Sequence, residues 1–143
     1  IGVHHPRIAV LSATESELPA MPSSVEAALI VAAASEVDPA AAYAGPLSFD
    51  LAVSPESAEI KGVDVNTQTG GVAGYADGLI VPDIVSGNVL FKSIVYFAGG
   101  LAAGLVVGGR VPIILTSRSD PPSSRLASLV LAQLYEAEGQ ISS

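Results

Sequence analysis

The sequence predicts an α/β fold, a mostly parallel sheet flanked by helices. Three observations predict it. Short apolar segments alternate with segments of helical character, a strand–loop–helix unit occurs twice in the second half, and apolar side chains recur at helical spacing near the C-terminus. For this order of elements, right-handed crossovers between parallel strands are the default. We expect one such region over residues 1–143, without internal repeats or a linker to a second domain.

Two strand and helix signals open the chain. Residues 7–12 form a short apolar run with a polar end, which predicts an inner strand. Ser23-Ser-Val-Glu26 matches the Ser-x-x-Glu capping box directly after Pro22, and an apolar run follows to Ala34. We therefore expect a helix that begins at this box.

The middle of the chain is rich in turn and helix-stop residues. Gly45-Pro46 predicts a turn, and residues 47–61 predict helical turns interrupted at Pro55 and stopped by Gly62. Residues 64–71 are mostly Asp, Asn, Thr and Gly with little apolar content, which predicts a mobile loop.

The second half contains the repeated strand–loop–helix unit. Residues 78–82 predict a short buried strand, residues 83–88 a polar loop, and residues 89–97 a helix. Strands are expected over 101–107 and 111–115 around the Gly108-Gly109 turn, followed by a polar loop over 116–120. The last helix is expected to begin at Pro121 behind an Asp120 cap, with its apolar stripe formed by Leu126, Leu129, Val130 and Leu134.

The composition is that of a globular protein. Of 143 residues, 50% are hydrophobic and 14% are charged, which excludes a disordered or collagen-like chain. Fourteen acids against six bases give a net charge of −8, so we expect no binding to nucleic acid or to an anionic membrane. The chain has no cysteine, which excludes disulfides and a cysteine nucleophile. Any reacting thiol would belong to a substrate.

One uncharged stretch has to be weighed as a membrane span. Residues 93–109 are 17 residues without a charge, which is the lower limit for a spanning helix. Because the Gly99-Gly100 pair is a helix stop, we expect instead a buried helix that ends near Ala98 and a buried strand over 101–107. The N-terminal residues 1–5 contain no basic segment leading into an apolar one. We therefore expect a cytoplasmic protein, or a piece of one.

Polar side chains cluster in the two loops that follow strands of the predicted sheet. Ligands bind at the carboxyl ends of strands in such folds, which makes these loops the first candidates for a site. The loops and their following helices contribute Asp83, Ser86, Asn88, Lys92, Thr116, Ser117, Arg118, Ser119 and Asp120. With only six basic residues in the chain, Lys92 and Arg118 are the plausible pair for an anionic ligand such as phosphate. Asp83, Asn88 and Asp120 are equally compatible with simple helix caps, and Lys92 with a surface lysine.

The sequence gives little support for a nucleotide-binding loop, a metal site or a catalytic triad. Neither of the common glycine-rich nucleotide-binding motifs is present. His4 and His5 precede the first strand and are the only histidines, so we expect no metal site and no Ser-His-Asp triad.

Several segments carry a likeness to a known family. These are Pro22-Ser-Ser-Val-Glu-Ala27, Gly45-Pro-Leu-Ser-Phe-Asp-Leu-Ala-Val-Ser-Pro-Glu56, Ile60-Lys-Gly62, Val81-Pro-Asp-Ile-Val-Ser-Gly-Asn-Val-Leu-Phe-Lys92 and Pro112-Ile-Ile-Leu-Thr-Ser-Arg-Ser-Asp120. In this order, over nearly the whole chain, they resemble the phosphate acetyl/butyryltransferase family. The resemblance implies an isocitrate/isopropylmalate dehydrogenase-like lobe and a homodimer.

The resemblance also implies an activity and a site. The reaction is reversible acyl transfer between coenzyme A and inorganic phosphate, by direct attack of the thiol on an acyl phosphate. Coenzyme A is then a substrate, and no cofactor is permanently bound. The implied catalytic residues are Ser117 and Arg118, with Asp83 or Asp120 as the base. Substrate-binding residues would be Ser86, Gly87, Asn88, Lys92 and Thr116.

The chain departs from the family pattern in two respects. Thr-Ser-Arg-x-Asp is closer to the butyryltransferase branch, and the acid that the acetyltransferase branch has further downstream would fall on Ser124. Family members are about twice as long, and this chain resembles their second half. Two alternatives therefore stay open. One is a non-catalytic or incomplete module that binds phosphate or coenzyme A. The other is a metal- and nucleotide-dependent dehydrogenase using Asp77, Asp83 and Asp120.

Overall fold

The computed structural model describes residues 2–117 and 120–141. Contacts divide the chain into two compact units, residues 2–88 and residues 89–143, which we call the first and second unit. Each is described by itself below. The sequence analysis did not anticipate this division.

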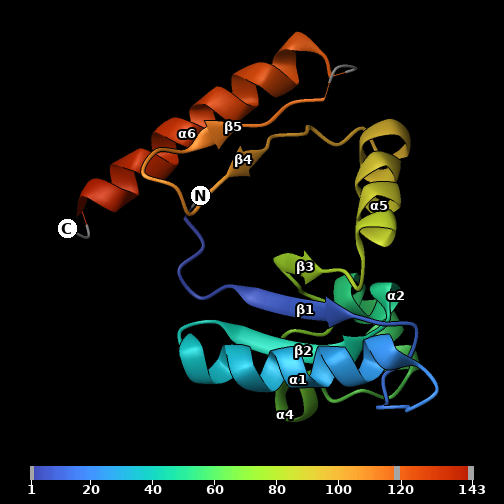
Figure 1. The fold of residues 1–143 in the computed structure, drawn as a ribbon. Coiled ribbons are helices and arrows are strands. Elements are labelled where there is room, and N and C mark those ends of the chain that lie inside the picture. The colour runs from blue at the N-terminus through green and yellow to red at the C-terminus, as the bar shows by residue number, and fades with distance from the viewer. Residues whose placement is uncertain (1, 118–119, 142–143) are drawn as a thin grey trace. The chain divides into compact units, whose positions relative to one another are not determined.

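The first unit is built on a three-stranded parallel sheet in the order β2-β1-β3. The strands are β1 (Arg7–Leu11), β2 (Ala42–Leu47) and β3 (Gly78–Ile80), and both pairings are parallel (Figure 1). Ile8 pairs with Tyr43 on one side and with Gly78 on the other. The predicted inner strand is therefore confirmed, and so is the α/β class with a parallel sheet.

The turn expected at Gly45-Pro46 is wrong, because both residues lie inside β2. Proline is tolerated in an edge strand, where its missing N–H removes no ladder bond, and β2 is an edge of the described sheet. Glycine is required next to it by close packing. A Cβ on Gly45 would lie 2.7 Å from the carbonyl oxygen of Val10 and 3.3 Å from Cγ2 of Val31. The pair thus lets β2 and a helix approach β1 closely.

That helix is α1 (Pro22–Val37), which packs on β1 and β2. The predicted capping box at Ser23 does not form, because the N-cap residue is Met21 and its side chain makes no capping bond. Ser24 performs the local bonding instead. Its fully buried hydroxyl accepts the N–H of Leu18 at 2.8 Å and lies 2.8 Å from the carbonyl oxygen of Met21. The helix therefore begins one residue earlier, at Pro22, whose ring suits a first helical position.

Short helices follow β2. The predicted interruption at Pro55 is confirmed, because α2 (Phe49–Val53) and α3 (Pro55–Ile60) meet there. The loop expected over 64–71 instead contains the helix α4 (Val65–Thr69). Asp64 caps it, with Oδ1 accepting the N–H groups of Asn66 and Thr67 at 3.1 and 3.0 Å. The polar composition that suggested a loop is the composition of a capped helical turn.

The core of the first unit lies between the sheet and these helices. Its buried hydrophobic side chains are Ala9, Val10, Leu11, Ala27, Ala44, Leu47, Leu51, Ala52, Ala58, Val72 and Ala73. Helices α2 and α4 contact β1 and β2 respectively. Small side chains dominate this core, which is consistent with close helix–sheet packing.

The described residues of the second unit form two helices and a two-stranded antiparallel sheet. Helix α5 (Ile84–Phe97) begins in the first unit and continues into the second, which then contains β4 (Leu105–Val106), β5 (Ile113–Ile114) and α6 (Pro122–Ile141). The two strands pair antiparallel, and α6 contacts both. Inside this unit, Ser128 is buried, and its hydroxyl accepts the N–H of Gly104 at 3.1 Å and donates to the carbonyl oxygen of Ser124 at 2.9 Å.

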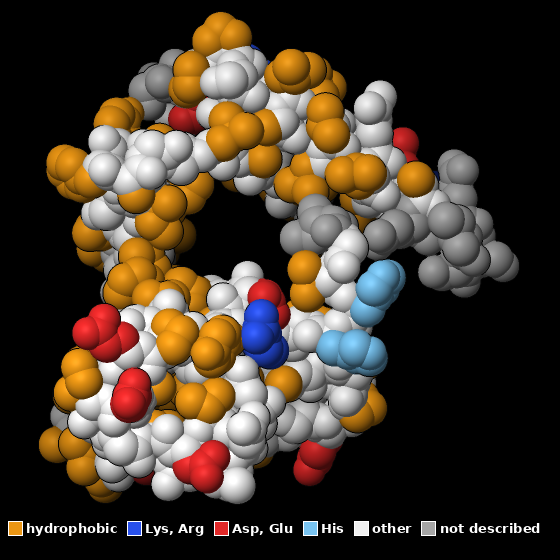
Figure 2. Space-filling view, turned by 180° about the vertical axis from the view of Figure 1, so that it is seen from behind, with side chains coloured by type: hydrophobic (Ala, Val, Ile, Leu, Met, Phe, Trp, Pro, Cys, Tyr) orange, Lys and Arg blue, Asp and Glu red, His pale blue; other side chains and the backbone are white. Residues whose placement is uncertain are grey.

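Several elements predicted for residues 89–115 differ from the structure in length or in burial. The strand expected over 101–107 covers only Leu105–Val106, and Leu101 is 66% exposed. Helix α5 ends at Phe97 as expected, but it contains no buried residue. Hydrophobic side chains are exposed along both α5 and α6, and Figure 2 shows such side chains over much of the visible surface. Among the described residues, no helix is both long and apolar enough to cross a membrane.

Candidate functional site

The carboxyl ends of the three parallel strands define one edge of the first unit. The loop of residues 12–21 leaves β1 there, Ser48 follows β2, and residues 81–83 follow β3. The central strand β1 ends beside the end of β2, where the N–H of Ser12 donates to the carbonyl oxygen of Leu47 at 2.8 Å. Segments from all three strands therefore meet at the edge where α/β sheets bind ligands.

Asp83 caps the helix that follows β3. Its Oδ1 accepts the N–H groups of Val85 and Ser86 at 2.8 and 2.9 Å, and its Oδ2 accepts the hydroxyl of Ser86 at 2.6 Å. The helix consequently starts at Ile84, five residues before the predicted start at Val89, and the expected loop over 83–88 is wrong. The Ser86 hydroxyl and the two backbone bonds lower the pKa of Asp83.

The other candidates from this segment lie on α5. Ser86, Gly87 and Asn88 occupy its first two turns, so Asn88 does not cap the helix. Gly87 permits a close approach, because a Cβ there would lie 2.9 Å from Cγ2 of Val81. Further along, the ammonium of Lys92 lies 5.4 Å from the ring centroid of Phe91 and 5.9 Å from that of Tyr96. Aromatic rings at this distance stabilise a cation, because the face of each ring is electronegative.

The second candidate loop lies in the second unit, after β5. Here Oδ2 of Asp120 accepts the N–H of Ser117 at 2.6 Å, and the N–H of Asp120 donates to the carbonyl oxygen of Ser117 at 3.1 Å. Both bonds connect Ser117 directly to Asp120, the residue before Pro121. Thr116 and Ser117 are partly exposed. Arg118 and Ser119 lie outside the described residues. Helix α6 starts at Pro122, one residue after the predicted start.

Two groups of predicted site residues are thus each held together locally. Asp83 and Ser86 bond to each other in the first unit, and Ser117 and Asp120 bond to each other in the second. That the two groups converge on one ligand stays a prediction.

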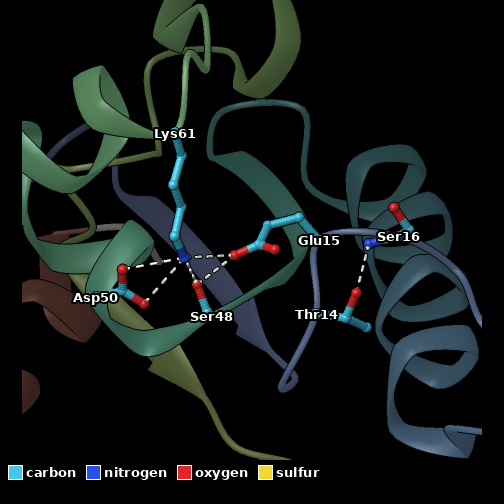
Figure 3. Close-up of polar contacts among 6 residues, drawn as sticks. All are labelled: Thr14, Glu15, Ser16, Ser48, Asp50 and Lys61. Carbon is cyan, nitrogen blue, oxygen red and sulfur yellow. Dashed lines mark hydrogen bonds and ion pairs between the residues drawn. The ribbon is translucent and has the colours of Figure 1, made fainter.

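A charged cluster at the carboxyl edge was missed by the sequence analysis. We call Glu15, Ser48, Asp50 and Lys61 the Lys61 cluster (Figure 3). The Lys61 ammonium lies 2.8 Å from Oε1 of Glu15, 2.7 Å from Oγ of Ser48 and 3.0 Å from Oδ2 of Asp50. The Ser48 hydroxyl in turn donates to Glu15. The scarcity of cations was the available signal, because Lys61 and Arg7 are the only basic residues between positions 2 and 88.

The titration behaviour of this cluster follows from its hydrogen bonds. The bond to Glu15, followed by the bond to Asp50, raises the pKa of Lys61. The same ammonium lowers the pKa of both carboxyls, and the Ser48 hydroxyl lowers them further. The cluster therefore remains fully ionised near neutral pH, with one cation between two anions.

A second ion pair lies at the opposite end of the sheet. Arg7, the first residue of β1, donates through Nε to Oδ2 of Asp77 at 2.9 Å and through Nη2 to Oδ1 at 3.0 Å. Asp77 precedes β3 whereas Asp83 follows it, so these two acids lie at opposite ends of one strand. Among the described residues, no three side chains of His, Cys, Asp or Glu lie close enough together to hold a metal ion.

Comparison with known proteins decides the family. The family model described as phosphate acetyl/butaryl transferase matches residues 1–132, which include every candidate residue discussed above. The chain belongs to this family. Its fold agrees, since a branched-chain phosphotransacylase from Enterococcus faecalis superposes with a TM-score of 0.80 at 44% sequence identity, over 92% of this chain and 46% of that one.

Curated members of the phosphate acetyl/butaryl transferase family match over most of this chain. A phosphate acetyltransferase of Rhizobium meliloti is 44% identical over 138 residues, which cover 96% of this chain and 42% of that protein. A phosphate butyryltransferase of Clostridium acetobutylicum is 37% identical over 135 residues, which cover 94% of this chain and 43% of that protein. The chain thus spans less than half the length of the relatives that it matches.

Proposed function

We propose that this chain is part of an acyltransferase that moves an acetyl or butyryl group between coenzyme A and inorganic phosphate. One observation carries the proposal, the family match over residues 1–132, within which acetyl- and butyryltransferases are both similar to this chain. Coenzyme A, phosphate and acyl phosphate are the proposed ligands. A cytoplasmic homodimer is the proposed setting.

The proposed reaction is direct transfer between two bound substrates. A base removes the thiol proton of coenzyme A, and the sulfur attacks the carbonyl carbon of the acyl phosphate. A C–S bond forms, the C–O bond to phosphorus breaks, and phosphate leaves with the electron pair. The products are acyl-coenzyme A and phosphate, and no redox change or metal is required by this balance.

Within this proposal, the second loop supplies the groups that meet the phosphate. Arg118 holds the phosphoryl oxygens, and Ser117 donates to the oxygen on which charge develops. Thr116 lies beside them in sequence and assists in binding. The bond from the Ser117 N–H to Asp120 supports these roles, because it holds the Ser117 backbone in place.

The proposed base is Asp120 in preference to Asp83. Both oxygens of Asp83 are engaged at the start of α5 by the Ser86 hydroxyl and by the N–H groups of Val85 and Ser86, and these bonds lower the pKa of Asp83, which makes it a weaker base for a thiol near neutral pH. We therefore propose that Asp83 contributes mainly by holding the first turns of α5. Ser86, Gly87, Asn88 and Lys92 are then presented to the substrates from that helix.

The test is phosphate-dependent consumption of acyl-coenzyme A, measured for this chain and for the whole polypeptide that carries it. We expect Arg118→Ala to lower turnover by about 10²–10³ in the active form and to weaken binding of acyl phosphate. Arg125→Ala, an exposed position on α6, is the matched control and retains full turnover. An Arg118→Ala variant with the wild-type rate contradicts the assigned role.

A second candidate function has one observation in its favour. The chain spans less than half of each relative quoted above, so it is compatible with a module that binds phosphate or coenzyme A without turnover. Saturable binding of coenzyme A by this chain, together with no acyl transfer by any form that contains it, favours the module. Acyl transfer by any such form favours the enzyme.

A further inference from the structure

The loop of residues 12–21 is fixed at both of its ends within the first unit. At its start, the Ser12 N–H donates to the Leu47 carbonyl oxygen, and the Ser12 hydroxyl lies 3.0 Å from that of Ser23. At its end, the Leu18 N–H donates to the buried Ser24 hydroxyl at 2.8 Å. Between these points, Glu15 reaches across to Lys61, 46 positions further along the chain.

Glu15 therefore connects the middle of the loop to a different part of the unit. Its carboxylate bonds to Ser48 at the end of β2 and to Lys61 at the end of α3 (Figure 3). It also lines a pocket of about 370 Å³, together with residues of β2 and α4 such as Leu47 and Thr69. Contacts that hold Glu15 in place therefore also hold the part of the pocket lining that Glu15 forms.

The geometry of Lys61 distinguishes direct binding of an anionic ligand from a role in positioning the loop. A lysine ammonium has three N–H donors, and Glu15, Ser48 and Asp50 provide one acceptor each. No donor is left for a phosphate, and the cluster has a net charge of −1, which repels one. A direct contact with an anionic substrate is therefore disfavoured, even though Lys61 is the only cation of the first unit placed beyond the carboxyl ends of the strands.

The helix that follows Ser48 gives independent support for a dedicated cluster. Ser48 is the N-cap residue of α2, but its side chain makes no capping bond. Serine is a favoured N-cap because its hydroxyl accepts a backbone N–H of the first turn. Here that hydroxyl accepts from Lys61 and donates to Glu15 instead. Helix α2 therefore lacks a side-chain cap, and the Ser48 hydroxyl instead connects the Lys61 ammonium to the Glu15 carboxylate.

We propose that Lys61 is a positioning residue that, through Glu15 and Ser48, holds the 12–21 loop as one wall of the ligand site at the carboxyl edge. The loop-holding step stands on the contacts of the first unit alone. The effect on the ligand rests on the proposed function, with coenzyme A as the ligand that the wall helps to place.

The first measurement follows the loop without any activity. A glutamate-specific protease cuts after Glu17 only when the loop opens, so the initial rate of that cut reports the open population. We expect Lys61→Met, which keeps the apolar stem and removes the charge, to speed this cut by about fivefold. Glu15→Gln is expected to speed it less, because an amide still bonds to the ammonium. Lys61→Arg keeps the charge and restores the slow rate.

Glu59→Gln is the matched control, because it removes an exposed carboxylate of α3 two residues from Lys61. It leaves the cutting rate unchanged. A thermal unfolding scan of each variant establishes that the chain still folds. An unchanged cutting rate in folded Lys61→Met overturns the proposal.

The second measurement is the affinity for coenzyme A by titration calorimetry. We expect Lys61→Met to weaken binding by about fivefold while Lys61→Arg and Glu59→Gln bind like the wild type. Faster cutting with undiminished affinity overturns the positioning role. If the wild-type chain binds no coenzyme A, the proposed function loses its support for this chain and the ligand step falls with it, while the cutting rates still decide whether Lys61 holds the loop.

Discussion

Asp77 shows how much a single exposed carboxylate can be tuned by one partner. Two hydrogen bonds from the Arg7 guanidinium and one from the Arg7 N–H lower its pKa to about 2. The Arg7 guanidinium also lies 5.6 Å from the ring centroid of Tyr75. This group ties the start of β1 to the residue before β3, which keeps the two strands in register.

The sign of the resulting pH dependence is fixed by the direction of the shift. Because the pKa of Asp77 is lowered in the folded state, its stabilising effect is present above the ordinary pKa of 3.8 and is lost as pH falls toward 2. We expect Asp77→Asn to lower the melting temperature at pH 7 and to have a smaller effect at pH 2. Melting scans of both proteins between pH 2 and 7 measure this. Glu36→Gln, at an exposed position of α1, is the control, and an Asp77→Asn effect independent of pH contradicts the ion-pair account.

Ser24 is the residue on which the start of α1 depends. Its hydroxyl is fully buried and bonds to both Leu18 and Met21. We expect Ser24→Ala to leave the Leu18 N–H without a partner and to lower the free energy of unfolding by about 1–3 kcal/mol. Ser23→Ala, which removes a partly buried hydroxyl near that of Ser12, is expected to cost less. Urea unfolding measures both, and an equal or larger cost for Ser23→Ala contradicts this assignment.

The sequence could predict that a serine hydroxyl forms hydrogen bonds at the start of this helix, but not which serine. Capping motifs are local patterns, and Ser23-Ser24 offers two hydroxyls within one residue of each other. The choice depends on Leu18, whose N–H is brought to Ser24 by the path of the preceding loop. Asp83 shows the opposite case. Both a capping and a catalytic role fitted the sequence, and the bonds to Val85 and Ser86 account for the former.

At the scale of elements, Gly45 determines how closely β2, β1 and α1 pack. We expect Gly45→Ala to destabilise the first unit by about 1–3 kcal/mol, because its Cβ would lie within 2.9 Å of two Val10 atoms that cannot move away easily. Gly109→Ala is the control, since a Cβ there would have its nearest neighbour at 3.4 Å. Urea unfolding distinguishes the two. A Gly45→Ala protein as stable as the wild type contradicts the close approach.

Elements with strong local signals were predictable, whereas elements held by contacts distant in sequence were not. The break between α2 and α3 follows from Pro55 alone, and β1 follows from its apolar run. Strand β2 was missed because Gly-Pro is usually a turn, and only its place beside Val10 makes it a strand. Helix α4 was missed because a five-residue segment with Val65 as its single apolar residue has no apolar periodicity, and its cap at Asp64 decides the conformation.

At the scale of the whole molecule, the candidate site was predictable as two loops but not as a constellation. Residue types and strand ends indicated Asp83, Ser86, Ser117 and Asp120, and each pair is bonded locally. Whether they converge depends on how the two units are arranged, and no local motif in the sequence predicts that arrangement. The Lys61 cluster was missed for a related reason, because its members come from three segments spread over residues 15–61.

The two units also differ in how they are stabilised, which gives a prediction for the whole chain. Eleven of the twelve buried hydrophobic residues of the described chain belong to the first unit, and Ala102 is the remaining one. We therefore expect the amides of β1 and β2 to exchange their hydrogens much more slowly than those of β4 and β5. Leu51 is completely buried, and Leu51→Ala should lower the stability of the first unit by about 2–5 kcal/mol.

One substitution in each unit tests whether the two units unfold independently. Leu51→Ala is expected to speed exchange in β1 and β2 and to leave β4 and β5 unaffected. Ser128→Ala removes the bond to the Gly104 N–H, so it is expected to speed exchange around β4 and β5 without changing β1 and β2. Hydrogen exchange followed by mass spectrometry of peptides from both units measures the four rates. If either substitution accelerates both pairs of strands equally, the chain unfolds as one cooperative body, and the contrast in buried side chains does not set its local stability.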